Sequence, residues 1–285
     1  MSKAKAYIKL IRPINCVMMG FAVIVGATLA GRETLTNQPQ NLLLGFLTGF
    51  FLTGAAMAVN DYYDRAIDAI NEPERPIPSG TVGPNEALGF AFFLTVTGFA
   101  AALWTGATPN WQCLAIAAVS WMIVILYATK AKRTGLPGNL AVSSCIAIPF
   151  IYGGFVIGKG LLPTTSIFVI MVFLSNTGRE ITKGIVDVQG DKENNIKTVA
   201  VLHGEKKAAS TAAVFYFSAV FITPLPWLWG IVTFWYLPLV ILTDLGLIWA
   251  SVRLLQIPSR ENAKKIKNRT LLWFFTGLLA FIAGA

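Results

Sequence analysis

The stretch Asn60-Asp61-Tyr62-Tyr63-Asp64-Arg65-Ala66-Ile67-Asp68 ends one of the long apolar runs of this chain. A second acidic stretch, Asp187-Val188-Gln189-Gly190-Asp191, ends another such run. Together they hold five of the 14 acidic residues of the 285-residue chain. Carboxylates are costly near hydrocarbon, so those that occur there usually have a function. The two stretches are therefore candidates for a functional site.

The composition predicts an all-α polytopic membrane protein. Hydrophobic residues make up 55% of the sequence and charged residues 13%, which is about half the charge of a soluble domain. The apolar residues form long blocks, as transmembrane helices do. We expect one membrane domain over residues 1–285, with nine helices around a central cavity. The expected spans are 14–31, 41–60, 86–106, 111–128, 138–158, 164–184, 207–224, 231–255 and 269–285.

Lysine and arginine are unevenly distributed between the two sides of this topology. One side, which includes the N-terminal segment, holds 21 of the 23 basic residues, and the other holds only Arg32 and Lys159. Because basic residues accumulate in cytoplasmic loops, we expect a cytoplasmic N-terminus and an external C-terminus. Both acidic stretches then face the cytoplasm. The topology also explains the basic net charge without a nucleic-acid partner.

The sequence lacks the motifs that mark several common classes of enzyme. The chain has no Walker-type nucleotide loop, no Cys/His metal quartet and no serine nucleophile elbow. Its cysteines, Cys16, Cys113 and Cys145, fit no metal or redox spacing, so we expect their side chains to pack among apolar residues.

A cation-coupled secondary transporter remains an alternative function, because acidic residues in a membrane bundle would suit it too. Against it, the acids cluster at one face, and only Asp244, which we expect to pair with a polar group, lies deep in a span.

The spacing of the acidic residues is helical. A helix would align Asn60, Asp64 and Asp68 on one stripe, and Asp187 and Asp191 on another. Paired carboxylates on converging helices suit Mg²⁺ that holds a phosphate-bearing substrate. The alternative to a metal site is that both stretches are only the charged, solvent-exposed ends of helices.

The two acidic stretches also suggest an internal repeat. Asp64 and Asp187 are 123 residues apart, as are Asp68 and Asp191. This equal spacing suggests four-helix halves at 1–130 and 131–256, plus a ninth helix at 269–285.

Cationic residues accompany both acidic stretches. Arg75 lies in a proline-rich segment, 71–80, which predicts a stiff loop that fixes the guanidinium beside a metal-bound diphosphate. Arg179 and Lys183 precede Asp187 and Asp191 on one predicted stripe, an arrangement that suits a phosphate–metal site. Alternatively, Arg75 is only a topology signal, and Lys183 forms ordinary intrahelical ion pairs with Glu180 and Asp187.

A third cytoplasmic patch covers residues 127–139. We expect Tyr127, Lys130 and Asn139 to line the cytoplasmic cavity, and the cations, Lys132 among them, to bind a second phosphate. The alternative is that these cations only set the topology.

The chain resembles the UbiA-type superfamily of intramembrane prenyltransferases. Its first signature, N-D-x-x-D-x-x-x-D, is matched by Asn60, Asp61, Asp64 and Asp68, and is followed by R-P-I-P-S-G at residues 75–80. Its second, D-x-x-x-D, is matched by Asp187 and Asp191. The stretches 11–16, 132–139 and 178–183 are most similar to the archaeal ether-lipid branch. Residues 194–198 depart from that branch, because a glycine-containing turn is expected there.

The resemblance implies geranylgeranyl transfer from its diphosphate to the free hydroxyl of geranylgeranylglyceryl phosphate, forming an ether bond. It implies that the five aspartates bind Mg²⁺, with Asn60 as a further polar ligand. Arg75 and Lys183 would add charge, and Tyr62, Tyr63 or Tyr127 would stabilise an allylic cation. The acceptor phosphate would bind Arg12, Lys130 or Lys132. An aromatic acceptor, such as a hydroxybenzoate or a quinone precursor, is the alternative substrate.

Overall fold

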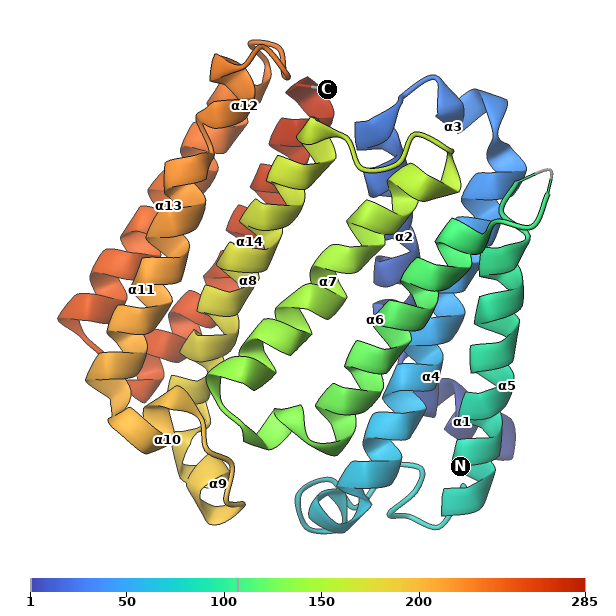
Figure 1. Ribbon diagram of the computed structural model, residues 1–285. Coiled ribbons are helices and arrows are strands. Elements are labelled where there is room, and N and C mark those ends of the chain that lie inside the picture. Colours follow the sequence, from blue (N-terminus) through green and yellow to red (C-terminus); the bar gives the residue numbers. More distant parts are fainter. Residues whose placement is uncertain (1, 107, 285) are drawn as a thin grey trace. The chain divides into compact units, whose positions relative to one another are not determined.

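The computed structural model describes residues 2–106 and 108–284, and these residues form helices joined by turns, with no strand among them. The elements, labelled in Figure 1, are α1 (Lys3–Ile11), α2 (Pro13–Ala30), α3 (Thr34–Asn37), α4 (Pro39–Asn71), α5 (Pro84–Leu103), α6 (Trp111–Thr129), η1 (Ala131–Arg133), α7 (Leu136–Val156), α8 (Pro163–Val186), α9 (Val188–Glu193), α10 (Val199–His203), α11 (Glu205–Ile222), α12 (Leu225–Leu228), α13 (Tyr236–Gln256) and α14 (Arg260–Gly284). The all-α prediction is confirmed.

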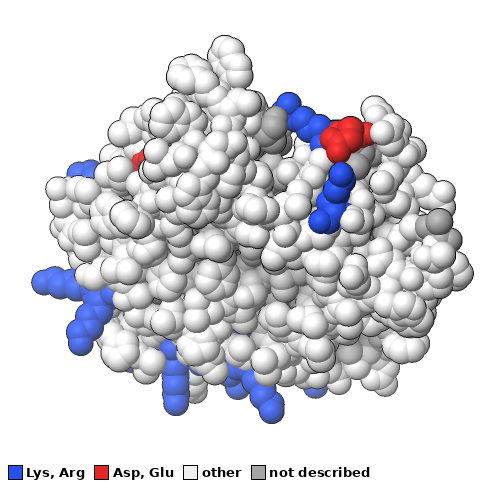
Figure 2. Space-filling model, turned by 45° about the horizontal axis from the view of Figure 1, so that its top comes forward, with Lys and Arg blue, Asp and Glu red and all other residues white. Residues whose placement is uncertain are grey.

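Each of the nine predicted spans falls on a helix. Eight helical segments of the described chain are long and apolar enough to cross a membrane. The remaining predicted span, 164–184, corresponds to α8, which has 24 residues but is not among the eight. Its second half contains Asn176, Arg179, Glu180 and Lys183, which dilute the apolar character of the helix. Most of the surface visible in Figure 2 is neither acidic nor basic, as expected for a chain in lipid.

Close packing divides the described chain into two compact units. The first comprises residues 1–129 and 148–161, and the second comprises residues 130–147 and 162–285. The division cuts α7, whose internal Pro149 lies just beyond the cut. The units therefore differ from the predicted halves, since the end of α7 joins the first unit and α14 joins the second. An internal repeat remains a prediction.

In the first unit, α4 packs against α2, α5 and α6. The end of α7 also approaches α2 very closely, and glycine makes this approach feasible. A Cβ atom on Gly26 would lie 2.1 Å from the carbonyl oxygen of Phe150, and one on Gly153 would lie 2.2 Å from that of Val23. Small residues at helix interfaces are typical of membrane proteins, where tight packing replaces the hydrophobic driving force.

In the second unit, α11 packs against α8 and α13, and α14 packs against α13 and α8. The Tyr216 ring lies against Gly178, and its hydroxyl is 3.2 Å from Thr182 Oγ1. On α13, Asp244 accepts a 2.7 Å hydrogen bond from Thr223 Oγ1, so the predicted pairing of this acid with a polar group is confirmed. These polar contacts link α8 to α11, and the end of α11 to α13.

The Gly26 contact gives a first testable prediction. Gly26→Val places side-chain atoms against a backbone carbonyl that has no freedom to rotate away, and we expect a loss of about 1–3 kcal/mol of stability. Thermal unfolding of the detergent-solubilised protein measures it. Gly89→Val is the matched control, because a Cβ atom there has no neighbour within 4 Å beyond the adjacent residues and the backbone of its own helix. Equal melting temperatures for the two variants would contradict the packing argument.

Candidate active site

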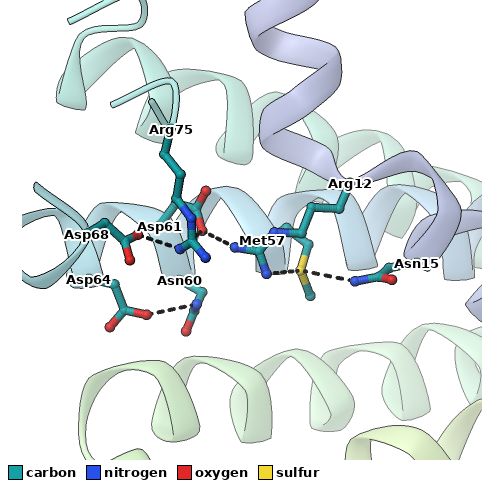
Figure 3. A network of polar contacts seen from close by, with 8 residues as sticks. All are labelled: Arg12, Asn15, Met57, Asn60, Asp61, Asp64, Asp68 and Arg75. Carbon is teal, nitrogen blue, oxygen red and sulfur yellow. Dashed lines mark hydrogen bonds and ion pairs between the residues drawn. The ribbon is translucent and has the colours of Figure 1, made fainter. Parts of the chain in front are cut away.

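The first cluster lies on the last turns of α4, where the side chains point in two directions. Asn60 Nδ2 donates a 3.0 Å hydrogen bond to Asp64 Oδ2. Asp61 and Asp68 are buried and contact arginines instead. In Figure 3 the Asn60–Asp64 pair lies apart from the arginine network. The predicted stripe of Asn60, Asp64 and Asp68 thus contains one carboxylate that is already paired with a cation.

Arg12 enters this cluster from the turn between α1 and α2. Its backbone is left-handed, with φ of 50°, a conformation that costs a non-glycine residue about 1–2 kcal/mol. Its Nη2 donates a 2.5 Å hydrogen bond to Asp61 Oδ1, and its Nη1 lies 3.5 Å from the sulfur of Met57. Asn15 also contacts this sulfur (Figure 3). The turn therefore directs a cation onto α4.

Arg75 enters from the loop after α4, as predicted. Its Nη1 donates a 2.6 Å hydrogen bond to Asp68 Oδ2 and lies 3.7 Å from Asp61 Oδ1. Burial acts to lower the pKa of Arg75, but the hydrogen bond and charge of Asp68, together with Asp61, raise it overall. The loop is tied to α1 by Lys9, whose ammonium donates to the Glu74 carbonyl at 3.0 Å. Arg75 is therefore a fixed cation.

The second cluster lies where α8 meets α9. The predicted continuous helical stripe is wrong in one respect, because α8 ends at Val186 and Asp187 lies between the two helices. The backbone still bonds in i+4 steps there: Asp187 N–H donates to the Lys183 carbonyl and Asp191 N–H to the Asp187 carbonyl. Of the two carboxylates, Asp187 is exposed and Asp191 is half-buried.

The cations of α8 share one carboxylate. Arg179 Nη1 lies 3.3 Å from Glu180 Oε1, and Lys183 Nζ lies 3.6 Å from Glu180 Oε2. The Glu180–Lys183 ion pair considered as an alternative is thus present, at i,i+3 spacing. Such a pair contributes only about 0.2–0.5 kcal/mol, so it leaves Lys183 able to exchange partners.

Asp191 has the more unusual electrostatic environment. Burial, followed by the charge of Asp187, raises its pKa to about 6. A hydrogen bond from Thr198 and the charges of Lys183 and Lys132 act in the opposite direction. The balance leaves two carboxylates that repel each other, and a bound cation would relieve that repulsion.

Residues 130–139 are joined to the turn that follows α9. Lys197 N–H donates to the Arg133 carbonyl at 3.2 Å, and a Cβ atom on Gly135 would lie 2.3 Å from the Lys197 carbonyl oxygen. The turn contains Asn195 at φ of 55°, in the left-handed region. Asparagine is the residue that most often replaces glycine there. Asn195 therefore takes the place of the glycine that was expected within residues 194–198.

The structure brings some predicted site residues together within each unit. In the first unit, Arg12, Asn60, Asp61, Asp64, Asp68 and Arg75 form one cluster. In the second, Arg179, Lys183, Asp187 and Asp191 are neighbours, and Lys132 acts on Asp191 electrostatically. Tyr127 is half-buried on α6, Lys130 is exposed beside η1, and Asn139 is half-buried on the first turns of α7.

Sequence reasoning missed three contributors to these clusters. Met57 lies one turn before Asp61 and contacts Arg12, and nothing in the sequence distinguishes it from a packing residue. Lys9 was counted only as a topology signal. Thr198 does have a signal, because a threonine before an apolar run predicts a helix N-cap. It caps α10 and also bonds Asp191.

The donor atoms suit Mg²⁺ that is shared with a substrate. Within residues 2–106 and 108–284, no three His, Cys, Asp or Glu side chains converge into a preformed metal cage. Mg²⁺ often takes one or two protein carboxylates and completes its shell with phosphate oxygens and water. Asp64 with Asn60, and Asp187 with Asp191, are oxygen donor sets of this size.

Apolar helices with carboxylate and guanidinium clusters at their ends define a polytopic membrane protein suited to a metal-bound phosphate. The chain belongs to the UbiA prenyltransferase family, whose model matches residues 19–282. It is therefore a membrane prenyltransferase, and the predicted family is confirmed.

Individual relatives are similar along nearly the whole chain. Digeranylgeranylglyceryl phosphate synthases of Methanopyrus kandleri and Methanosarcina mazei are both 36% identical to it, over 98% of each chain. A solved structure of a digeranylgeranylglyceryl phosphate synthase in membranes has a TM-score of 0.87 at 33% identity, over 100% of this chain and 99% of the other. A UbiA homologue of Archaeoglobus fulgidus bound to GPP and Mg²⁺ has a TM-score of 0.67 at 16% identity, over 97% and 99%, which shows a shared fold.

The raised pKa of Asp191 predicts a pH-dependent response to Mg²⁺. Without metal, the stability that this carboxyl contributes is present below its ordinary pKa and is lost as the pH rises through about 6. Mg²⁺ binds the ionised form and competes with the proton. We therefore expect Mg²⁺ to raise the melting temperature more at about pH 7.5 than at about pH 5.

The matched control for this measurement is Asp191→Asn, which removes the titrating group with little change in shape. Its Mg²⁺-induced shift should be small and similar at both pH values. An unchanged pH dependence in Asp191→Asn would contradict the assignment.

Proposed function

We propose that this protein transfers a geranylgeranyl group from geranylgeranyl diphosphate to the free hydroxyl of geranylgeranylglyceryl phosphate, in archaeal ether-lipid biosynthesis. The observation that carries the proposal is the 36% identity to digeranylgeranylglyceryl phosphate synthases over 98% of both chains. The charged clusters support it independently, because they combine oxygen donors for Mg²⁺ with cations for phosphate.

The donor diphosphate requires both oxygen donors and cations. We assign Asp64, Asp187 and Asp191, with Asn60, to Mg²⁺ binding, and we assign Asp68, which accepts a hydrogen bond from Arg75, to holding that cation in place. When bound, Mg²⁺ supplies Lewis-acid stabilisation of the departing diphosphate. The allylic C1–O bond breaks, diphosphate leaves with the electron pair, and the acceptor hydroxyl oxygen forms the new bond to C1 as it loses its proton. The numbers of atoms and electrons balance without any oxidant or reductant.

The cations divide into fixed and exchangeable groups. Arg75 and Arg12 are fixed by Asp61 and Asp68, so they would present charge to the diphosphate without reorganisation. Lys183 is half-exposed and only loosely paired with Glu180, so it could move onto a phosphate. Arg179 is more buried against the same glutamate, which favours a supporting role, and its Nε has no hydrogen-bond partner among the described residues.

The developing allylic cation needs an aromatic face. The guanidinium of Arg65 covers the Tyr62 ring at 4.5 Å, and the Tyr63 ring packs edge-on against Tyr62. These contacts occupy the aromatic pair on α4. Tyr127, which is half-buried on α6, is the third candidate for cation stabilisation.

The acceptor carries its own phosphate. Lys130 is exposed and Lys132 is half-buried, and both lie in the segment next to the second acidic cluster. We assign the acceptor phosphate to these lysines and to Asn139, because Arg12 belongs with Arg75 to the pair of cations assigned to the donor diphosphate. The excess of basic residues on one side supports a cytoplasmic position for both clusters.

The acceptor prediction is tested with purified enzyme in detergent. Labelled geranylgeranyl diphosphate is supplied with geranylgeranylglyceryl phosphate, and in parallel with a hydroxybenzoate. We expect an ether product that resists alkaline hydrolysis from the lipid phosphate only, with Mg²⁺ required. A prenylated aromatic product would favour the alternative acceptor, and ion uptake by vesicles without any product would favour the transporter.

The metal assignment is tested with Asp64→Ala and Asp191→Ala. Removing one carboxylate should lower Mg²⁺-dependent turnover by a factor on the order of 100 or more, because the metal loses a direct ligand. Gel filtration and thermal unfolding establish that the variants remain folded. Glu193→Ala is the control, because it removes an exposed carboxylate from the same short helix. Wild-type turnover in either aspartate variant contradicts the assignment.

A further inference from the structure

Asp61 belongs to the first acidic motif, yet its surroundings differ from those of a metal ligand. Its side chain is only 3% exposed, and its Oδ1 accepts from Arg12 at 2.5 Å and lies 3.7 Å from Arg75 Nη1. Figure 3 shows both guanidinium groups beside this carboxylate, while Asn60 and Asp64 pair with each other elsewhere on α4.

The charges of this network alternate along a chain of contacts. Arg12 bonds Asp61, Asp61 lies beside Arg75, and Arg75 bonds Asp68. A divalent cation placed on Asp61 would stand beside two guanidinium groups and would be repelled by both. It would also have to displace the hydrogen bond from Arg12, which is short and charge-assisted. Asp61 is therefore a poor position for Mg²⁺.

The two arginines come from different elements and share only this carboxylate. Arg12 belongs to the turn between α1 and α2, and Arg75 belongs to the loop after α4. Their side chains are 34% and 27% exposed, so each guanidinium keeps donors accessible after binding Asp61. A guanidinium has five N–H donors in a rigid fork, and this geometry suits phosphate.

We propose that Asp61 is a positioning residue that orients Arg12 and Arg75 toward the donor diphosphate and does not ligate Mg²⁺. This inference rests on the proposed function for the identity of the ligand. It separates two roles within one acidic motif, in which Asp64 binds metal and Asp61 holds the cations that bind phosphate.

The test compares Asp61→Asn with Asp64→Asn, because each removes one charge with almost no change in shape. Steady-state rates are measured while Mg²⁺ and geranylgeranyl diphosphate are varied separately. For Asp61→Asn we expect the KM for the diphosphate to rise about tenfold, with the half-saturating Mg²⁺ concentration within about twofold of wild type. For Asp64→Asn we expect the half-saturating Mg²⁺ concentration to rise about tenfold or more.

A second set of variants separates positioning from general loss of structure. Arg12→Lys keeps the charge but loses the fork, and should reproduce the higher KM for the diphosphate. In the double variant Asp61→Asn/Arg12→Lys the two effects should not multiply, because Asp61 acts through the arginine. Asp64→Asn combined with Arg12→Lys should give nearly independent effects. If Asp61→Asn does not fold, Arg12→Lys alone still tests the diphosphate and Mg²⁺ dependences.

Binding of a non-reactive thiodiphosphate analogue, measured by calorimetry, keeps this test independent of the acceptor. Weaker analogue binding by Asp61→Asn at saturating Mg²⁺ supports the proposal even if the lipid-phosphate acceptor is wrong. An increased Mg²⁺ requirement in Asp61→Asn equal to that of Asp64→Asn would make Asp61 a ligand and overturn the proposal. Wild-type behaviour in both titrations would overturn it as well.

Discussion

The buried ion pairs at the end of α4 are the contacts on which the first unit depends. Charges withdrawn from water are costly, and removing one partner of a buried pair typically costs about 3–5 kcal/mol. Asp61 and Asp68 offset this cost with Arg12 and Arg75, which come from two separate connections. The same contacts thus join the first turn of the chain, the long helix and the loop that follows it.

The second unit uses its carboxylates in a different way. Asp187 and Asp191 follow one another across a break between helices, and their repulsion is only partly offset by Lys183 and Lys132. Two carboxylates of the first cluster are therefore paired directly with fixed guanidinium groups, whereas the lysines of the second cluster act on Asp191 through their charge. Carboxylates suit the metal of a metal-bound diphosphate, and arginines suit its phosphates.

Periodicity and composition predicted much of the fold, because long apolar runs have few alternatives to helices. The acidic motifs were also evident, since carboxylates are rare beside such runs. Three features depended on tertiary contacts. The role of Asp61 required the positions of Arg12 and Arg75, which are distant in sequence. The break at Asp187 has no proline or glycine to signal it. The left-handed Asn195 followed from no pattern, although asparagine permits it.

Thr198 bonds the Asp191 carboxylate and also accepts the N–H of Val201 at the start of α10. One hydroxyl thus joins a candidate metal ligand to a helix of five residues. At the far end of that helix lies His203, the one histidine of the chain. The hydroxyl that contacts Asp191 therefore lies one short helix away from that imidazole. Because the chain has one histidine, the two ring C–H resonances of His203 can be followed without any label.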